Sequence, residues 1–161
     1  MIASAHLAAG IVIGMASDHV ARGNFTRVST AFAAAAVVHL LMDAVPHSDY
    51  ELFPMSTIPF VIAGEFLAVL IIAVVVLRNR LTPHWPQSVS AGLLGSVLPD
   101  AKFIAPFFLS ASSARLVETY GNRLHAPFHT SANSAVLGMV TQLSCTILLL
   151  VVLAAFPRTR A

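Results

Sequence analysis

The chain has 161 residues, of which 57% are hydrophobic and only 10% are charged. Soluble domains carry about 25% charged residues, so this composition excludes an ordinary water-soluble globule. The nine basic residues are scattered along the chain rather than clustered, which argues against a nucleic-acid partner. A single cysteine, Cys145, excludes an internal disulfide. We therefore expect an all-α integral membrane protein with a single membrane domain over residues 1–161.

A helix needs about 20 mostly apolar residues to cross the roughly 30 Å hydrocarbon core of a bilayer. Five stretches predict transmembrane helices, at residues 2–17, 25–45, 59–77, 87–108 and 131–156. No Lys or Arg precedes the first apolar run, which argues against a cleaved signal peptide. Pro99 and Asp100 interrupt the fourth stretch, so we expect that helix to be short or broken. The polar stretch 110–124 is expected to be a connection outside the hydrocarbon.

The arginines predict how these helices are oriented, because Lys and Arg are enriched on the cytoplasmic side of membrane proteins. With five crossings, one face receives six of the nine basic residues: Arg22, Arg27, Arg78, Arg80, Arg158 and Arg160. The other face receives Lys102, Arg115 and Arg123, diluted by acidic residues. We therefore expect a multi-pass protein with its N-terminus outside and its C-terminus in the cytoplasm.

Ionisable side chains inside a membrane are costly, and their presence indicates a function by default. On the predicted topology, nine of them gather at the outer end of the bundle: His6, His39, Asp43, His47, Asp49, Glu65, Asp100, His125 and His129. The opposite end offers only Asp18, His19 and His84, beside arginines. This asymmetry predicts a functional site at the outer end.

Two pairs in this set have the spacing of metal ligands. His39 and Asp43 are four residues apart, so they lie on one helix face and can present two ligands to one ion. His125 and His129 repeat this spacing, and Pro127 between them is tolerable only in a first helical turn, which predicts the start of the last helix. Imidazole and carboxylate ligands suit Zn²⁺, with Mn²⁺ or Fe as alternatives. The candidate ligands are numerous enough for one or two ions.

Each candidate also has a structural interpretation. A membrane histidine such as His6 can hydrogen-bond between helices, and His39 with Asp43 can form a structural polar pair. An acid after a proline, as in Pro99 and Asp100, is also typical of a turn. The remaining candidates can be ordinary solvated or packing residues: His47, Asp49, Glu65, His125 and His129.

Three short motifs carry a resemblance to a known family. The first is HLLMDAVPH at residues 39–47, which resembles the His-x3-Asp-x2-Pro-His element of small bacterial predicted membrane-bound metal-dependent hydrolases. It is also distantly similar to an element of zinc-dependent phospholipase C and its nuclease relatives. The second is LPD at 98–100, similar to the family's Leu-Pro-Asp, and the third is HAPFHTS at 125–131, which resembles its His-Arg-Gly-x-Thr-His-Ser. His6 corresponds to an N-terminal histidine of the family.

Residues and resemblance together predict a membrane-embedded metal-dependent hydrolase of the bacterial inner membrane. It would act near the outer leaflet on a lipid or lipid-linked (phospho)ester, so a membrane lipid is the expected partner. The expected metal ligands are His6, His39, Asp43, Asp100, His125 and His129. His47 and Asp49 are candidates for direct contact with the metal or for proton transfer. Lys102 stands where the family has a second acid, and is a candidate for contact with an anionic substrate.

The alternative is a non-enzymatic membrane protein that handles metal ions or protons, or an accessory subunit. Transport requires polar groups near the midplane of the membrane and beyond it. The predicted cytoplasmic half is instead almost purely aliphatic, as in residues 70–77 and 148–156. The sequence therefore favours the hydrolase.

Overall fold

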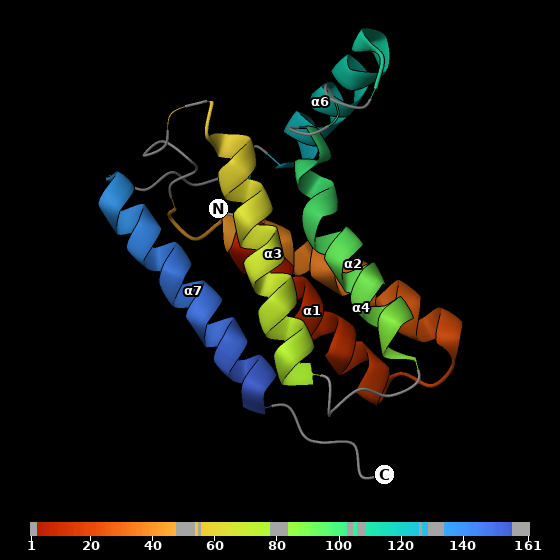
Figure 1. Ribbon diagram of the computed structural model, residues 1–161. Helices are drawn as coiled ribbons and strands as arrows, with labels where there is room; N and C mark the ends of the chain where they lie inside the picture. Colours follow the sequence, from red (N-terminus) through yellow and green to blue (C-terminus); the bar gives the residue numbers. More distant parts are fainter. Residues whose placement is uncertain are drawn as a thin grey trace.

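The computed structural model describes residues 3–47, 54, 56–77, 84–102, 105, 109–125, 127–128 and 134–155. Over these residues the protein is all-helical, as the sequence predicts. The elements are α1 (Ala3–Val20), α2 (Asn24–Asp43), α3 (Ile58–Leu77), α4 (Trp85–Val97), the 3-10 helix η1 (Leu98–Asp100), α6 (Ala111–His125) and α7 (Ala135–Ala155). Figure 1 shows α1, α2, α3, α4 and α7 as an elongated bundle, with α6 at one end of it.

Short sequence signals set the ends of several helices. Gly23 has a φ of 91°, which the turn between α1 and α2 requires and which glycine adopts without strain. Pro86 lies in the first turn of α4, where its missing N–H has no helical partner to lose. Pro99 cannot donate to the carbonyl of Gly95, so the α-helix gives way there to η1. The fourth predicted segment is therefore short and interrupted at the predicted proline.

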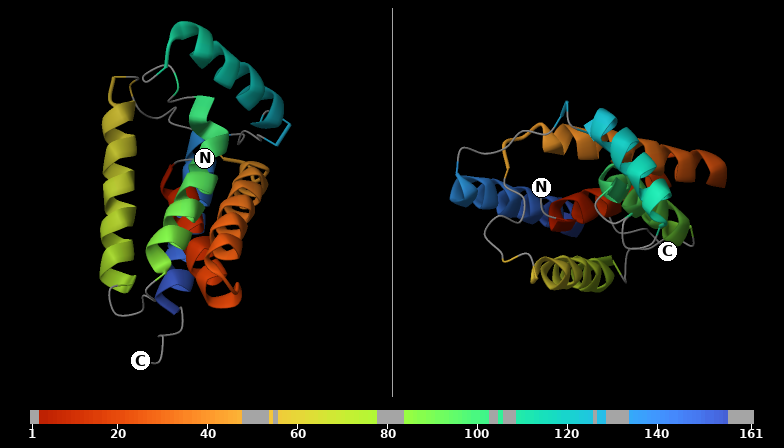
Figure 2. Two further views of the ribbon diagram at one scale, coloured as in Figure 1. Left: turned by 90° about the vertical axis from the view of Figure 1, so that its right-hand side faces the viewer. Right: turned by 90° about the horizontal axis from the view of Figure 1, so that it is seen from above.

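The tightest packing joins α1, α2 and α4, while α3 and α7 lie against α1 (Figure 2). Glycines let the backbones meet. A Cβ on Gly92 of α4 would collide with the carbonyl oxygen of Gly10 in α1, and one on Gly95 would collide with that of Phe32 in α2. Small residues at such crossings are how helices in lipid gain close contact.

The buried residues of α2 form a stripe with a spacing of four: Ala31, Ala35, His39 and Asp43. Residues at this spacing lie above one another on one helix face. The two alanines let α2 approach its neighbours closely, and the same face then continues into a histidine and an aspartate. The packing of the alanines therefore also sets the direction of the two polar side chains.

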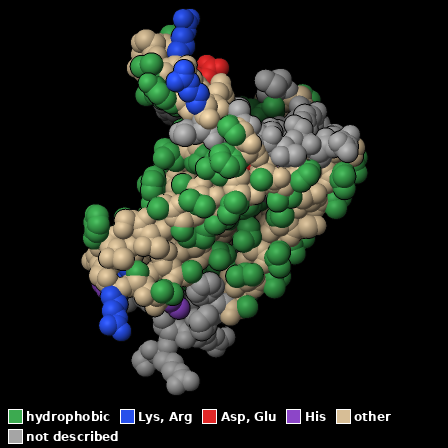
Figure 3. Space-filling view, turned by 180° about the vertical axis from the view of Figure 1, so that it is seen from behind, with side chains coloured by type: hydrophobic (Ala, Val, Ile, Leu, Met, Phe, Trp, Pro, Cys, Tyr) green, Lys and Arg blue, Asp and Glu red, His purple; other side chains and the backbone are tan. Residues whose placement is uncertain are grey.

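The outer surface of the bundle is largely apolar, while polar groups are buried inside it. Phe60 on α3 and Leu148 on α7 are 78% and 63% exposed, whereas His6, His39 and Asp43 are each 1% exposed. Figure 3 shows hydrophobic side chains over the middle of one face, with Lys and Arg side chains near its ends. Large exposed apolar surfaces are typical of contact with lipid or with a partner.

Two helices in the described ranges are long and apolar enough to cross a bilayer, Asn24–Asp43 and Val136–Ala155, rather than the five expected. Only 17% and 22% of the apolar stretches of these two helices is buried inside the protein, whereas the core helix of a soluble protein is mostly buried. The apolar stretch Ile58–Ile71 of α3 is shorter. The 13 residues of α4 rise only about 20 Å, which is less than the hydrocarbon thickness. The length and composition of two helices thus support membrane association.

The stretch expected to be a polar connection is helix α6. Its apolar side is formed by residues at helical spacing, among them Ala114, Val117 and Gly121. His125 is the last residue of α6, whereas the sequence suggested that it begins the last helix, which starts instead at Ala135. Pro127 follows the end of α6 by two residues, a usual position for proline beyond a helix, so it terminates α6 rather than starting α7.

At the end of the bundle formed by the C-terminus of α1, a buried polar contact joins three helices. Oδ1 of Asp18 on α1 lies 3.8 Å from Nε of Arg27 on α2 and accepts a hydrogen bond of 3.4 Å from Oγ of Ser88 on α4. Asp18 is 7% exposed. These contacts assign Asp18 a structural role in holding α1, α2 and α4 together.

The glycine crossing predicts a stability difference between two matched substitutions. Gly92→Ala places a Cβ against the backbone of Gly10, so α1 and α4 must separate and the free energy of unfolding should fall by about 1–3 kcal/mol. Gly64→Ala on α3 meets nothing within 4 Å, and should be neutral or stabilising by about 0.5–1 kcal/mol. Thermal unfolding in detergent compares the two, and equal Tm values would contradict the close crossing.

Candidate metal centre

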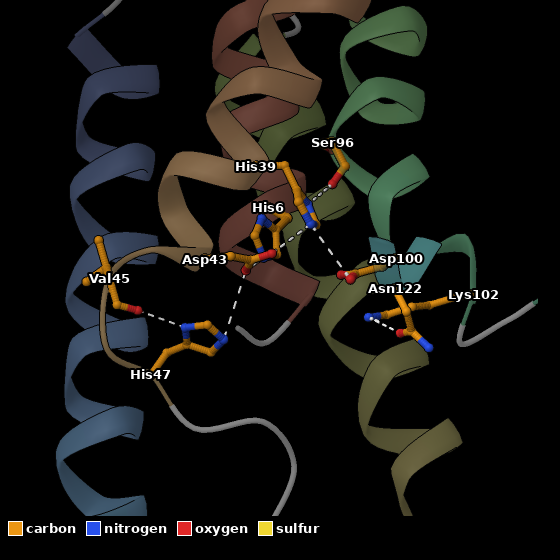
Figure 4. A network of polar contacts seen from close by, with 9 residues as sticks. All are labelled: His6, His39, Asp43, Val45, His47, Ser96, Asp100, Lys102 and Asn122. Atoms are coloured by element: carbon orange, nitrogen blue, oxygen red, sulfur yellow. Dashed lines mark hydrogen bonds and ion pairs between the residues drawn. The ribbon is translucent and has the colours of Figure 1, made fainter. Parts of the chain in front are cut away.

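Five of the candidate side chains come together at one end of the bundle (Figure 4). His6 lies near the start of α1, His39 and Asp43 at the end of α2, His47 just beyond it, and Asp100 in η1. The first four are essentially buried, whereas the side chain of Asp100 is 31% exposed. Asp100 is therefore the member of the cluster that is most accessible from outside.

The carboxylate of Asp43 lies at the centre of the cluster. Its Oδ2 is 3.0 Å from Nε2 of His39, and its Oδ1 is 3.2 Å from Nε2 of His6 and 3.9 Å from Nε2 of His47. Nε2 of His39 also lies 3.7 Å from Oδ1 of Asp100. The rings of His6 and His39 stack with their centroids 4.0 Å apart. Three imidazole Nε2 atoms thus face one carboxylate.

Backbone carbonyls orient two of these rings. Nδ1 of His39 lies 2.6 Å from the carbonyl oxygen of Ser96, and Nδ1 of His47 lies 2.8 Å from that of Val45. Because a carbonyl oxygen only accepts, Nδ1 of each ring carries a proton and donates it. In the neutral ring, Nε2 then presents a lone pair toward Asp43. A ring held in this way through its other nitrogen is typical of histidines that bind metals.

Pro99 removes one backbone partner that the carbonyl of Ser96 could otherwise have. In a 3-10 turn the partner of this carbonyl would be the backbone nitrogen three residues on, which is that of Pro99 and has no hydrogen. The proline that ends α4 thus also leaves an acceptor beside the cluster. Sequence reasoning missed this contact, and Pro99 is the one signal that could have indicated it.

The contact between His39 and Asp43 requires a positive charge. A lone pair on Nε2 and a carboxylate oxygen 3.0 Å apart repel each other unless a proton or a cation lies between them. Zinc–ligand bonds of about 2.0–2.2 Å at tetrahedral angles place neighbouring ligand atoms about 3.3 Å apart. The two shortest contacts of Asp43, 3.0 Å and 3.2 Å, are close to this value.

The burial of His6 provides a second test of whether these residues fit a metal ion. Nδ1 of His6 is buried and has no hydrogen-bond partner among the described residues. Leaving such a group unsatisfied costs about 1–3 kcal/mol, a cost that coordination through Nδ1 would remove and coordination through Nε2, the nitrogen that faces Asp43, would not. Ligand atoms of His6, His39 and Asp43 all lie within 4.8 Å of one another. These three residues could therefore hold a metal ion.

Glu65, whose role the sequence left open, contacts the backbone of α1. Its Oε2 accepts a hydrogen bond of 3.4 Å from the backbone nitrogen of Ser4. The first N–H groups of a helix lack helical partners, and a carboxylate there is also favoured by the helix dipole. Glu65 thus anchors α3 to the start of α1, two residues before His6.

Two of the other predicted site residues lie on α6 or just beyond η1. Nζ of Lys102 donates a hydrogen bond of 3.1 Å to Oδ1 of Asn122 on α6 (Figure 4). His125 is the C-terminal residue of α6. Asp49 and His129 lie outside the described residues. The described cluster therefore comprises His6, His39, Asp43, His47 and Asp100.

The chain matches no protein-family model, and no curated protein or solved structure is significantly similar to it. The interpretation of the cluster therefore depends on its own geometry and on the motifs of the sequence.

The cluster predicts that metal binding depends on His39. Protein purified in detergent without chelator should contain zinc, and His39→Ala should reduce that content at least about tenfold, because it removes one donor and the lone pair that faces Asp43. His84→Ala is the matched control, since His84 is exposed at the start of α4. Elemental analysis measures both. Equal zinc in the two variants, or no metal in the wild type, would exclude the site.

Proposed function

We propose that this protein is a membrane-embedded, metal-dependent hydrolase that cleaves a phosphoester or related ester bond of a lipid near the outer leaflet. The observation that carries the proposal is the meeting of three imidazole Nε2 atoms at the buried carboxylate of Asp43. The carboxylate of Asp100, which is partly exposed, adds a donor that can be reached from outside the bundle. A hydrolytic zinc site needs about three protein ligands and an open position for water.

The proposed membrane topology includes more helices than the two that are long and apolar enough to cross a bilayer. In this proposal α1, α3 and the short α4 complete a bundle with α2 and α7, with the N-terminus outside and the C-terminus in the cytoplasm of a bacterial inner membrane. The apolar outer surface of α3 and α7 supports this arrangement.

The residues of the cluster have distinct proposed roles. His6, His39, Asp43 and Asp100 hold the ion, and His125 and His129 remain proposed ligands from the sequence. Imidazole and carboxylate donors favour Zn²⁺, with Mn²⁺ or Fe as alternatives. A divalent cation bound there supplies Lewis-acid activation of water and charge stabilisation at the attacked centre.

The remaining predicted residues would serve the substrate. His47, whose ring is held by the carbonyl of Val45, is proposed to accept and return a proton near the cluster, and Asp49 is proposed for the same task. Lys102, two residues after Asp100, provides a cation for an anionic substrate. The position of the cluster at one end of the bundle favours ester bonds at the depth of lipid headgroups.

Hydrolysis should depend on Asp100 more than on Lys102. Asp100→Asn keeps the size of the side chain but removes its charge, so zinc content and phospholipid hydrolysis should both fall, hydrolysis by more than about 100-fold. Lys102→Ala should keep the zinc and raise KM for an anionic phospholipid, as expected for the loss of a ground-state contact. Zinc analysis and kinetics on vesicle lipid test this. Full activity of Asp100→Asn would leave Asp100 as a turn residue only.

The proposed orientation predicts which residues an impermeant reagent reaches. In a Cys145→Ser background, a cysteine replacing Ser113 on α6 should react with an impermeant maleimide on intact cells. A cysteine replacing Asn24, at the start of α2 and near Arg22 and Arg27, should not react. The reverse pattern would place the cluster on the cytoplasmic side and refute action at the outer leaflet.

A further inference from the structure

A cavity of about 440 Å³ lies between α2, the η1 region and α6. Ala36 and Leu40 line it from α2, Leu98 and Pro99 from η1, and Val117 from α6. Its volume falls within the range of about 300–1,000 Å³ that is typical of ligand pockets. The cavity is therefore large enough to hold part of a substrate.

The lining of this groove is apolar apart from one cation and one hydroxyl. Lys102 lines the wall with its aliphatic stem, which lies against Gly121 of α6, and its Nζ reaches an exposed hydrogen bond with Asn122. The hydroxyl belongs to Tyr120, which is 61% exposed. An apolar groove with a cationic rim is complementary to a hydrocarbon chain that carries an anionic head.

The groove adjoins the metal cluster through the backbone. Leu40 follows His39 directly, and Pro99 and Ala101 flank Asp100. A chain that occupied the groove would bring its polar end to Lys102, two residues from Asp100, whose Oδ1 is 3.7 Å from Nε2 of His39. Because Asp100 is the accessible side of the cluster, this is the side from which an ester bond would approach.

Helix α6 leaves the groove open toward the surroundings. Tyr120, which lines the groove, and Leu116, one turn earlier, are 61% and 60% exposed. An amphipathic helix that combines such side chains with a charged face is typical of the membrane interface. A lipid chain could therefore enter the groove from the bilayer along α6.

We propose that this groove holds one acyl chain of an anionic phospholipid, with Lys102 beside the phosphate. The inference rests on the proposed function, because the groove selects the lipid on which the cluster acts. The polar and apolar parts of the lipid then meet separate parts of the site, the head at Lys102 and Asp100 and the chain between α2 and α6.

Variants that fill the groove test whether it binds the acyl chain, without depending on hydrolysis. Ala36→Phe blocks the groove, whereas Ala33→Phe adds the same ring at an exposed position of the same helix outside it. The probe is phosphatidylglycerol with a photoactivatable diazirine in its acyl chain, in nanodiscs, and labelled residues are located by mass spectrometry. Labelling of Leu40 and Val117 should fall at least tenfold in Ala36→Phe and persist in Ala33→Phe. Unchanged labelling in Ala36→Phe would overturn the proposal.

A second lipid, a folding control and a chain-length series complete the test. A phosphatidylcholine analogue with the same diazirine should label the groove several-fold less, and equal labelling would overturn the selection of anionic lipid. The Tm in detergent verifies that Ala36→Phe is folded, and Val117→Trp, which fills the groove from α6, replaces it if the Tm falls sharply. In wild type, each methylene added to a short-chain substrate should lower KM about fourfold until the groove is full.

The outcomes separate the groove from the reaction. Saturable groove labelling without hydrolysis of any phospholipid would support the groove and contradict the proposed hydrolase. Hydrolysis without groove labelling, or a KM that is independent of chain length, would contradict the groove and leave the hydrolase supported.

Discussion

The direct contact between the backbones of α1, α2 and α4 is the constraint on which the rest of the structure depends. Gly10 with Gly92, and Gly95 with Phe32, bring the three helices together without intervening side chains. His6 and Asp43 lie on different helices, so their 3.2 Å contact exists only at this separation. A larger side chain at a crossing would separate the donors as well as the helices, and the site therefore depends on glycines that do not belong to it.

Polar groups are buried between these helices while their outer surface is largely apolar, and the buried polar contacts help to hold the helices together. In the proposed membrane setting, apolar side chains gain little from leaving the solvent, so close packing and polar contacts between helices supply the attraction. Asp43 joins α1 to α2 through His6, and the carbonyl of Ser96 joins α4 to α2 through His39. A metal ion bound by residues of separate helices would stabilise the same arrangement, because binding energy at such a site is also folding energy.

Several parts of the site could be predicted from the sequence because each depends on one helix alone. The spacing of His39 and Asp43 places them on one face, and Pro99 interrupts the fourth segment whatever surrounds it. The carbonyl of Ser96 could not be predicted, because every residue carries a carbonyl and only the fold shows which one meets a histidine. The sequence treats residues 110–124 as a connection outside the hydrocarbon and does not indicate that they form helix α6, because their low hydropathy outweighs the helical spacing of their apolar residues. The crossing of α4 at Gly92 required knowledge of which helices are neighbours.

The register of the three central helices links their two polar ends. Twelve residues separate His6 from Asp18 on α1 and Arg27 from His39 on α2, and twelve also separate Ser88 from Asp100. At 1.5 Å per residue, each helix therefore covers about 18 Å between the contact centred on Asp18 and the metal cluster. Sliding any one helix by a single turn would break both sets of contacts at once, because each helix carries a member of both. The buried contact of Asp18 thus stabilises the alignment of His6, His39 and Asp100 from the opposite end of the bundle, although it takes no part in their chemistry.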